Sequence, residues 1–231
     1  MTESVLFTWS GGKDSAMALY ELQNAGGYEI SALLTTVTKD YDRISMHGVR
    51  MVLLEQQADS LGYRLEQIFI SKSASNEEYE AKMQEVLEKY LETGVSAVAF
   101  GDIFLEDVRK YREENLSKIG MKAIFPIWKR NTTELAQTFI DLGFKAVITC
   151  VDSTVLNKGF VGRRFDERFL SELPSNVDPC GENGEFHSFV YDGPNFRKRL
   201  LYDLGEVVFR DNRFYFCDLI PRLRRNKKIN Q

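Results

Sequence analysis

The hexapeptide Ser10-Gly11-Gly12-Lys13-Asp14-Ser15 combines the residue types that bind phosphate groups. It lies between an apolar run, Val5–Trp9, and a segment with helical periodicity, so we expect it to open a helix. Unpaired N–H groups at a helix N-terminus attract anions, and two glycines let that backbone approach a phosphate closely. Ser10 and Ser15 add hydroxyl donors, and Lys13 adds a positive charge. The spacing fits neither the Walker pattern nor the three-glycine dinucleotide fingerprint, and an ordinary strand-to-helix turn is the alternative.

A second cluster of reactive side chains lies in the segment Asp178–Pro194, which contains three glycines and two prolines. Its ionisable residues include Glu182, Glu185, His187 and Asp192. A loop rich in turn residues that carries closely spaced carboxylates and one of only two histidines is a candidate site. The alternative is a solvated loop anchored in the core by Phe186 and Phe189, and the residues alone favour neither.

Short apolar runs alternate with helical periodicity along the first two thirds of the chain. β-Branched and aromatic residues, with turn residues nearby, predict five strands: Val5–Trp9, Ile30–Val37, Arg64–Ile70, Ala97–Ile103 and Ala146–Val151. The Ser75–Glu78 segment is a capping box for one of the intervening helices. Alternating strands and helices predict an α/β fold, with a parallel sheet covered by helices on both faces.

This alternation breaks down after Ile127. Turn residues dominate positions 157–194, and a hairpin is predicted from Gly205–Phe209 and Arg213–Cys217. We therefore expect two domains: residues 1–127, which carry the glycine-rich hexapeptide, and a smaller α+β domain, residues 128–231. The strand at Ala146–Val151 fits either side of this boundary.

The composition of the chain excludes several classes of protein. Its 231 residues are 43% hydrophobic and 28% charged, which excludes extended disorder and fibrous folds, and the formal net charge is −4. Cys150, Cys180 and Cys217 are too widely spaced for a disulfide framework or a zinc ribbon. The N-terminus lacks the features of a signal peptide, and no apolar run reaches the length of a membrane helix. We expect a soluble, reduced, cytoplasmic protein with no membrane partner.

The Ser-Gly-Gly-x-Asp-Ser pattern of residues 10–15 resembles the PP-loop of the ATP pyrophosphatases. This resemblance implies that ATP is cleaved between its α and β phosphates, that AMP passes to an acceptor oxygen, and that the loop holds the pyrophosphate. It also implies that Asp14 helps to place Mg²⁺ and thereby acts in catalysis. Residues 1–127 would then be the ATP-binding domain, and residues 128–231 would handle the acceptor.

The segment Gly181-Glu-Asn-Gly-Glu-Phe-His-Ser-Phe189 resembles the C-terminal motif of the diphthine–ammonia ligase family. Three further segments resemble that family: Met46–Gly48, Phe100–Glu106 and Gly120–Trp128. The family implies a Rossmann-like parallel sheet of the HUP type, with strand order 3-2-1-4-5. It also implies a ligase that uses ATP to activate the carboxylate of diphthine on elongation factor 2 and converts it to an amide with ammonia.

The same resemblance suggests roles in the second motif. Glu182 or Glu185 would accept a proton from the attacking ammonia, and the residues leave the choice between them open. Asn183 and His187 would contact the acceptor.

The ends of the predicted strands supply further nucleotide contacts. By the resemblance, Thr35 near the end of the second strand would lie against the adenine. Gly101 and Asp102 follow the fourth strand, at the position where ligands bind in such a sheet, and a helix cap is the alternative for Asp102. His47 would contact a phosphate or lie on the surface. The next predicted helix carries Arg109, Tyr111 and Arg112, and these side chains face either the cleft or solvent.

Two other functions fit part of the sequence. A related PP-loop enzyme acting on a small molecule or a tRNA would have the same hexapeptide, and the acceptor is open if the source cell makes no diphthamide. A non-catalytic adenine-nucleotide sensor, similar to the universal stress proteins, would need no second motif.

The basic segment Pro221–Lys228 predicts a solvated tail, and binding to RNA or to an acidic protein surface is the alternative. A nucleic-acid partner is therefore not expected. The sequence does not decide whether the chain forms a homo-oligomer.

Overall fold

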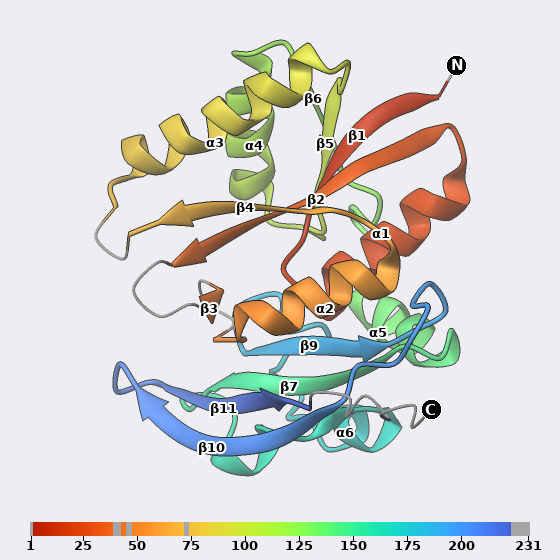
Figure 1. Cartoon of the computed structure of the whole chain (residues 1–231). Coiled ribbons are helices and arrows are strands. Elements are labelled where there is room, and N and C mark those ends of the chain that lie inside the picture. Colours follow the sequence, from red (N-terminus) through yellow and green to blue (C-terminus); the bar gives the residue numbers. More distant parts are fainter. Residues whose placement is uncertain (1, 39–42, 45–47, 72–73, 223–231) are drawn as a thin grey trace, which may run out of the picture.

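Two β-sheets and the helices around them make up the computed structural model of the chain, which describes residues 2–38, 43–44, 48–71 and 74–222 (Figure 1). The N-terminal sheet lies above the C-terminal sheet in this view, and helices α1 (Lys13–Ala25) and α2 (Met51–Leu61) lie between the two. No helix within these ranges is both long and apolar enough to cross a membrane.

Five parallel strands form the N-terminal sheet. Their spatial order is β4 (Leu65–Ile70), β2 (Tyr28–Thr38), β1 (Glu3–Thr8), β5 (Ala97–Ala99) and β6 (Lys122–Ile124). A two-residue strand, β3 (Arg43–Ile44), pairs antiparallel with the end of β2. Numbered by their appearance in the chain, the parallel strands run 3-2-1-4-5, which confirms the predicted fold class and strand order.

Helices cover both faces of this sheet. α1 and α2 lie on one face, and α3 (Asn76–Glu92) and α4 (Glu106–Ser117) lie on the other. The N-cap half of the predicted capping box is present at α3, where the hydroxyl of Ser75 accepts a hydrogen bond from the backbone N–H of Glu78 (3.2 Å). Gly62 ends α2 in the left-handed conformation (φ 83°), which is least costly for glycine.

The side chains of β1 alternate between two hydrophobic clusters on opposite faces of the sheet. Leu6 packs in the smaller cluster, beneath α3 and α4. Val5 and Phe7 pack in the larger cluster, which includes α1 and α2 and continues into the C-terminal sheet through Phe189. Because one apolar core spans both sheets, separating them would expose that core to water.

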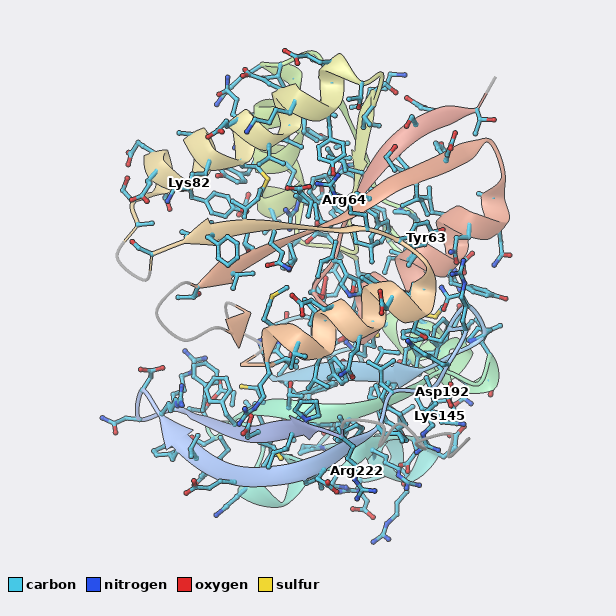
Figure 2. The ribbon with its side chains drawn as sticks, in the orientation of Figure 1. Tyr63, Arg64, Lys82, Lys145, Asp192 and Arg222 are labelled. Atoms are coloured by element: carbon cyan, nitrogen blue, oxygen red, sulfur yellow. The ribbon has the colours of Figure 1, made fainter. Side chains whose placement is uncertain are left out.

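β7 (Lys145–Asp152) is the central strand of the antiparallel C-terminal sheet, and seven of its eight residues are buried. It pairs with β9 (Phe186–Asp192) along its length, and the ion pair between Lys145 and Asp192 (3.0 Å) joins these two strands (Figure 2). The remaining strands of this sheet are β8 (Arg164–Phe165), β10 (Tyr202–Arg210) and β11 (Phe214–Pro221). The helices beside it are α5 (Thr132–Asp141), α6 (Glu167–Ser171) and the 3-10 turn Lys158–Phe160.

The predicted hairpin is confirmed, because β10 and β11 pair antiparallel around Asp211 and Asn212. Both turn residues have positive φ angles (53° and 49°), which asparagine and aspartate tolerate better than most side chains.

Two strands differ from the sequence-based expectation. The apolar run Ala146–Val151, which fitted either domain, lies in β7 of the C-terminal sheet, and the fifth parallel strand is β6 instead. β6 has only three residues and begins with an exposed lysine, so it lacks the apolar run that identified the other strands. The strand predicted at Ala97–Ile103 ends at Ala99, and the residues after it form a loop at the carboxyl edge of the sheet.

Candidate functional site

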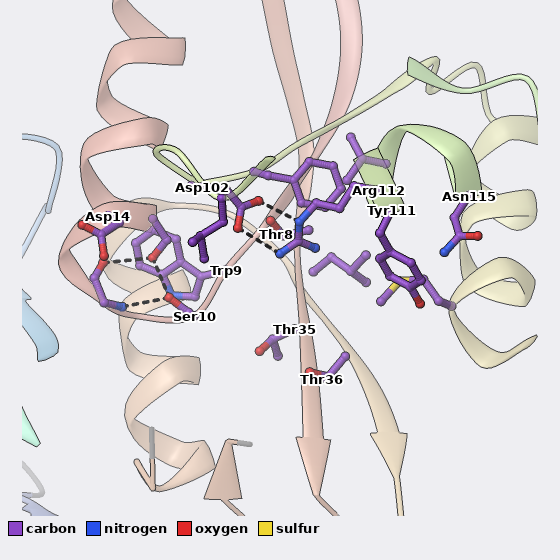
Figure 3. Close-up of a pocket in the computed structure, with 18 of the residues that line it drawn as sticks. Thr8, Trp9, Ser10, Asp14, Thr35, Thr36, Asp102, Tyr111, Arg112 and Asn115 are labelled. Atoms are coloured by element: carbon purple, nitrogen blue, oxygen red, sulfur yellow. Dashed lines mark hydrogen bonds and ion pairs between the residues drawn. The ribbon is translucent and has the colours of Figure 1, made fainter. Parts of the chain in front are cut away.

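A cavity of about 750 Å³ lies at the carboxyl ends of β1, β2 and β5 (Figure 3). Its walls come from both halves of the chain: the glycine loop (residues 10–15), the strand ends, α3, α4 and part of the acidic loop (residues 178–187). Ligands bind at this edge of open α/β sheets, and the volume is typical of a site for a small molecule or cofactor.

The glycine loop aims the start of α1 into the cavity. Gly11 has a φ of +77°, a conformation that favours glycine, and Gly12 is the N-cap residue without a side-chain cap. The hydroxyl of Ser15 donates to the carbonyl of Gly12 (2.9 Å), and the hydroxyl of Ser10 donates to that of Ser15 (3.1 Å). The positive end of the α1 dipole, two hydroxyls and a lysine therefore converge on one end of the cavity, which suits a polyphosphate.

Gln57 of α2 ties the glycine loop to the C-terminal sheet. The side chain is fully buried, and its Nε2 donates to the carbonyls of Gly11 (3.0 Å) and Val190 (2.6 Å). Its Oε1 accepts a hydrogen bond from the indole N–H of Trp9 (2.9 Å). The backbone N–H of Val190 also donates to the carbonyl of Gly11 (2.9 Å). Strand β9 is thereby fixed against the glycine loop.

We expect Gln57→Ala to lower the free energy of unfolding by about 3 kcal/mol, because it leaves several buried polar groups without a partner. Urea unfolding followed by tryptophan fluorescence measures this loss. The adjacent, half-buried Gln56 supplies the matched control, and Gln56→Ala is expected to change stability by about 0.5 kcal/mol or less. Equal losses in the two variants would show that the Gln57 hydrogen bonds do not hold the loop.

Lys13 reaches from the glycine loop to the acidic loop. Its ammonium pairs with the carboxylate of Asp14 (2.8 Å) and donates a hydrogen bond to the carbonyl of Cys180. Burial disfavours the charge of this side chain, which is 4% exposed, but the hydrogen bond to Asp14 and the nearby negative charges, that of Asp14 first among them, together outweigh burial and hold the pKa of Lys13 above its ordinary value. Lys13 is therefore a cation at the point where the two predicted motifs meet.

Glu182 of the acidic loop faces the cavity. Its Oε1 accepts a hydrogen bond from the backbone N–H of Ile103, in the loop after β5 (3.1 Å). Burial, together with the nearby negative charge of Asp14, raises the pKa of Glu182 to about 7. A carboxylate with such a pKa can both accept and release a proton at neutral pH, as general acid–base catalysis requires.

Glu185 lies behind the cavity wall and is 5% exposed. Its Oε1 accepts hydrogen bonds from the backbone N–H of Asp178 (3.0 Å) and the side-chain amide of Asn183 (3.0 Å), and its Oε2 accepts one from the backbone N–H of Asn183 (2.9 Å). Burial alone would raise the pKa of Glu185, but these hydrogen bonds outweigh burial and hold it below its ordinary value. Glu185 braces the acidic loop, so the geometry favours Glu182 as the proton acceptor.

The imidazole of His187 lines the cavity. Burial, aided by the positive charge of Lys13, lowers the pKa of His187 to about 4. The ring is therefore neutral at physiological pH, and it can take part in hydrogen bonds with an acceptor without adding charge.

The far end of the cavity is largely apolar and lies between α3 and α4. Leu87 of α3, Leu116 of α4 and Val98 of β5 line it, and Thr35 of β2 borders it. This apolar pouch is crossed by a hydrogen bond from the hydroxyl of Tyr111 to Glu80 (2.9 Å), which links the two helices. An apolar pouch bordered by a strand end suits a purine base better than a phosphate.

An ion pair between Asp102 and Arg112 lies between the glycine loop and this pouch (Figure 3). Nε of Arg112 is 2.7 Å from Oδ2 of Asp102. The preceding residue, Gly101, packs so closely against α1 that a Cβ there would lie 3.0 Å from the backbone of Ser15. The lack of a side chain at Gly101 thus brings Asp102 next to the glycine loop.

The structure brings most of the predicted site residues together. Those that line the cavity are Ser10, Gly12, Lys13, Asp14, Ser15, Thr35, Gly101, Asp102, Glu182, Asn183 and His187. Gly11 and Glu185 lie behind the wall, and His47 lies outside the described residues. Of the helix residues whose direction was open, Tyr111 and Arg112 face the cavity, whereas Arg109 packs over Phe125 and Trp128. Sequence reasoning missed Gln57, because nothing in a helical glutamine indicates that it is buried.

Two family models together match nearly the whole chain. The diphthamide synthase N-terminal domain matches residues 3–123, and the diphthamide synthase C-terminal domain matches residues 131–223. The chain belongs to the diphthamide synthase family. The resemblance found in the sequence is thereby confirmed, and the cavity lies where residues of the two matched regions meet.

Similar proteins include two that are named diphthine–ammonia ligase. The Homo sapiens protein is 27% identical over 223 residues, which cover 86% of this chain and 82% of that protein. The Bos taurus protein is 33% identical over 120 residues, which cover 49% of this chain and 45% of that protein. A solved structure, the U34-tRNA thiolase NcsA from Methanococcus maripaludis with its [4Fe-4S] cluster, is also similar. The match covers 60% of this chain and 58% of the thiolase chain. Its TM-score is 0.36 at 15% identity, which is too low to bear on function.

Proposed function

We propose that this protein is an ATP-dependent diphthine–ammonia ligase. It activates the carboxylate of diphthine on elongation factor 2 as an acyl adenylate, releases pyrophosphate, and then forms the amide with ammonia. The observation that carries this proposal is the contact of the glycine loop with the acidic loop across one cavity, with Lys13 hydrogen-bonded to the carbonyl of Cys180. A nucleotide site alone would not need the acidic loop within reach of the phosphates.

In the first step, an oxygen of the acceptor carboxylate attacks the α-phosphorus of ATP, and the bond from that phosphorus to the β-phosphate oxygen breaks. The negative charge that develops on the departing pyrophosphate meets the N-terminus of α1, the hydroxyls of Ser10 and Ser15, and the ammonium of Lys13. Preorganised donors of this kind stabilise charge where it develops. The base of ATP lies in the apolar pouch, against Thr35.

Asp14 is the residue that would hold Mg²⁺. The described residues contain no group of three or more histidine, cysteine or acidic side chains that could hold a metal ion by themselves. Mg²⁺ is commonly bound by only one or two carboxylates together with substrate phosphates, so a single carboxylate beside a phosphate site fits this ion. Bound there, Mg²⁺ would neutralise charge on the phosphates.

In the second step, the nitrogen of ammonia attacks the acyl carbon, and AMP leaves as the bond from that carbon to its phosphate oxygen breaks. The nitrogen must lose a proton as the tetrahedral intermediate collapses, and Glu182 accepts it. Asn183 and the neutral imidazole of His187 line the same part of the cavity, and we propose that they orient the acceptor. This division assigns residues 1–127 to ATP and residues 128–231 mainly to the acceptor, in a cytoplasmic protein.

The products of ATP cleavage test this proposal. With diphthine-bearing elongation factor 2 and an ammonium salt, we expect AMP and pyrophosphate in equal amounts, and a mass change on the factor that corresponds to replacing a hydroxyl by an amino group. Chromatography of the nucleotides and mass spectrometry of the factor measure both. ADP and phosphate as the main products would contradict the loop assignment. Pyrophosphate release with a tRNA or a small carboxylic acid, but not with the factor, would change the acceptor, and ATP binding without turnover would indicate a sensor.

A further inference from the structure

Arg112 is the cation that lines the middle of the cavity. Among the described residues, the basic side chains in the cavity wall are Lys13, Arg112 and Lys118. Lys13 is at the glycine loop, and Lys118 lies just beyond the end of α4, at the far end of the pouch. Figure 3 shows Arg112 next to Asp102, between Asp14 of the glycine loop and Tyr111 of the pouch.

The guanidinium of Arg112 is held from two sides. Its Nε is 2.7 Å from Oδ2 of Asp102, and its Nη2 donates to Oδ1 of the same carboxylate (3.2 Å). The central carbon of the guanidinium lies 4.3 Å from the ring centre of Phe100, in a cation–π contact. Asp102 and Phe100 thus hold one edge and one face of the group, while the N–H donors of Nη1 remain outside the ion pair.

The Asp102–Arg112 pair has one buried edge. Oδ2 of Asp102 and Nε of Arg112 are both buried and lie 2.7 Å apart, so each atom is the ionic partner of the other. A ligand in the cavity would therefore be bound through the outer N–H groups of the guanidinium, at Nη1 and Nη2, rather than through this buried edge.

The order of groups along the cavity identifies that ligand. If the pyrophosphate end of ATP lies on the glycine loop and the base lies in the pouch, the α-phosphate and the ribose must lie between them. The charged residues between them are Asp102 and Arg112. A carboxylate accepts hydrogen bonds from ribose hydroxyls and repels a phosphate, whereas a guanidinium binds phosphate oxygens.

We propose that Arg112 is a catalytic residue of the adenylation step and that its guanidinium binds a non-bridging oxygen of the α-phosphate. This inference rests on the function proposed above and adds a residue to it. Lys13 and α1 stabilise the leaving pyrophosphate, whereas Arg112 stabilises the negative charge on the non-bridging oxygens of the α-phosphate under attack. Asp102 positions Arg112 and binds the ribose.

Binding of adenosine and AMP tests the contact without turnover. The two ligands differ only by the α-phosphate, so the ratio of their dissociation constants measures what that phosphate contributes. We expect wild type and Arg109→Ala to bind AMP about 10-fold or more tightly than adenosine, and Arg112→Ala to bind the two alike. Arg109 is the matched control, because it lies on the same helix but outside the cavity wall. An unchanged ratio in Arg112→Ala, measured by calorimetry, would overturn the proposal.

Pyrophosphate release tests the catalytic role. We expect Arg112→Ala to lower kcat by about 10²–10³-fold, and Arg112→Lys to lose less, because lysine keeps the charge but not the planar fork. ATP with sulfur in place of one non-bridging oxygen of the α-phosphate exists as two diastereomers. The ratio of the rates of pyrophosphate release from these two diastereomers measures the preference of the wild type, and we expect this preference to fall in both Arg112 variants. Normal kcat with an unchanged preference would overturn the assignment. Arg112→Lys also keeps a cation beside Asp102, so it serves if Arg112→Ala folds poorly.

These outcomes separate the two proposals. If wild type forms no AMP, pyrophosphate or amide with the factor and ammonium, the proposed ligase function fails, while the adenosine and AMP ratios still decide the role of Arg112. If wild type is active and its Arg112 variants behave like Arg109→Ala, only the role of Arg112 fails.

Discussion

Glu182→Gln is expected to lower amide formation by about 10²–10⁴-fold while ATP affinity changes by only a few-fold. The substitution keeps the size of the side chain and an oxygen that accepts from Ile103, but it removes the carboxylate that we propose takes the proton from ammonia. Glu182 is in the acidic loop and its pKa is raised to about 7 mainly by burial, so at neutral pH it is free to exchange a proton. Calorimetry with ATP and mass spectrometry of the amide measure the two quantities.

The pH dependence provides a second test of Glu182. Below pH 7 the carboxyl is protonated and cannot act as a base, so the rate of the amide step is expected to rise with pH and level off above about pH 7. The concentration of free ammonia also rises with pH and is held constant by adjusting the ammonium salt. Glu182→Gln should lack this inflection.

The stability of Glu182→Gln separates a catalytic loss from misfolding. The pKa of Glu182 is higher in the folded protein (about 7) than its ordinary value of 4.5, so the folded state binds more protons within this window. The contribution of Glu182 to stability is therefore lost as pH rises from 4.5 to 7. The glutamine variant does not carry this loss, and at pH 8 it is expected to be at least as stable as wild type.

Glu185→Gln is the matched control in the same loop. Glu185 accepts three hydrogen bonds inside the loop, and glutamine offers only one acceptor oxygen, so this variant is expected to lose about 1–3 kcal/mol of stability. A large loss of amide formation in Glu185→Gln without a loss of stability would contradict the assignment of the base to Glu182. A parallel fall of ATP affinity and pyrophosphate release in Glu182→Gln would instead place that carboxylate in the nucleotide site.

Local sequence was sufficient to predict the parts of the fold that depend on local chemistry. The β1 strand, the glycine loop and the start of α1 follow one another within 25 residues, and each has its own composition signal. β6 has no such signal, because three residues at the sheet edge are recruited by pairing with β5 rather than by their own hydrophobicity. The boundary at residues 127 and 128 stays a proposal on the same grounds, since no composition change marks it sharply.

The candidate site shows the same limit at the level of side chains. Glu182 and Glu185 are three residues apart in one motif, and the sequence could not separate them, because their directions depend on the Ile103 and Asp178 backbones. Arg109 and Arg112 are likewise three apart on one helix, and only the packing of α4 directs Arg112 into the cavity. Residue types indicated the chemistry that this site could support, whereas tertiary contacts determined which copy of each type faces the cavity.

Asp14→Asn is expected to lower Mg²⁺-dependent pyrophosphate release by about 10³-fold or more, since the metal contributes several kcal/mol to the stabilisation of charge on the phosphates. Asparagine keeps the shape of the side chain but loses the charge that attracts the ion. The same loss removes the negative charge that pairs with Lys13, whose ammonium lies 2.8 Å from Asp14, although the asparagine oxygen can still accept from it. In the presence of EDTA, the variant should therefore bind ATP at least as tightly as wild type, because one carboxylate no longer repels the triphosphate.

Titration of pyrophosphate release with Mg²⁺, beside calorimetry of ATP with and without EDTA, measures both effects of Asp14→Asn. Asp107→Asn is the control, because Asp107 also lies in the first turn of a helix, α4, but is exposed and outside the cavity wall. That variant should show the wild-type Mg²⁺ response. A wild-type Mg²⁺ titration in Asp14→Asn would mean that the metal is held by other groups. A loss of ATP affinity in EDTA would mean that Asp14 supports the loop rather than the ion, because without metal the carboxylate can only repel the phosphates.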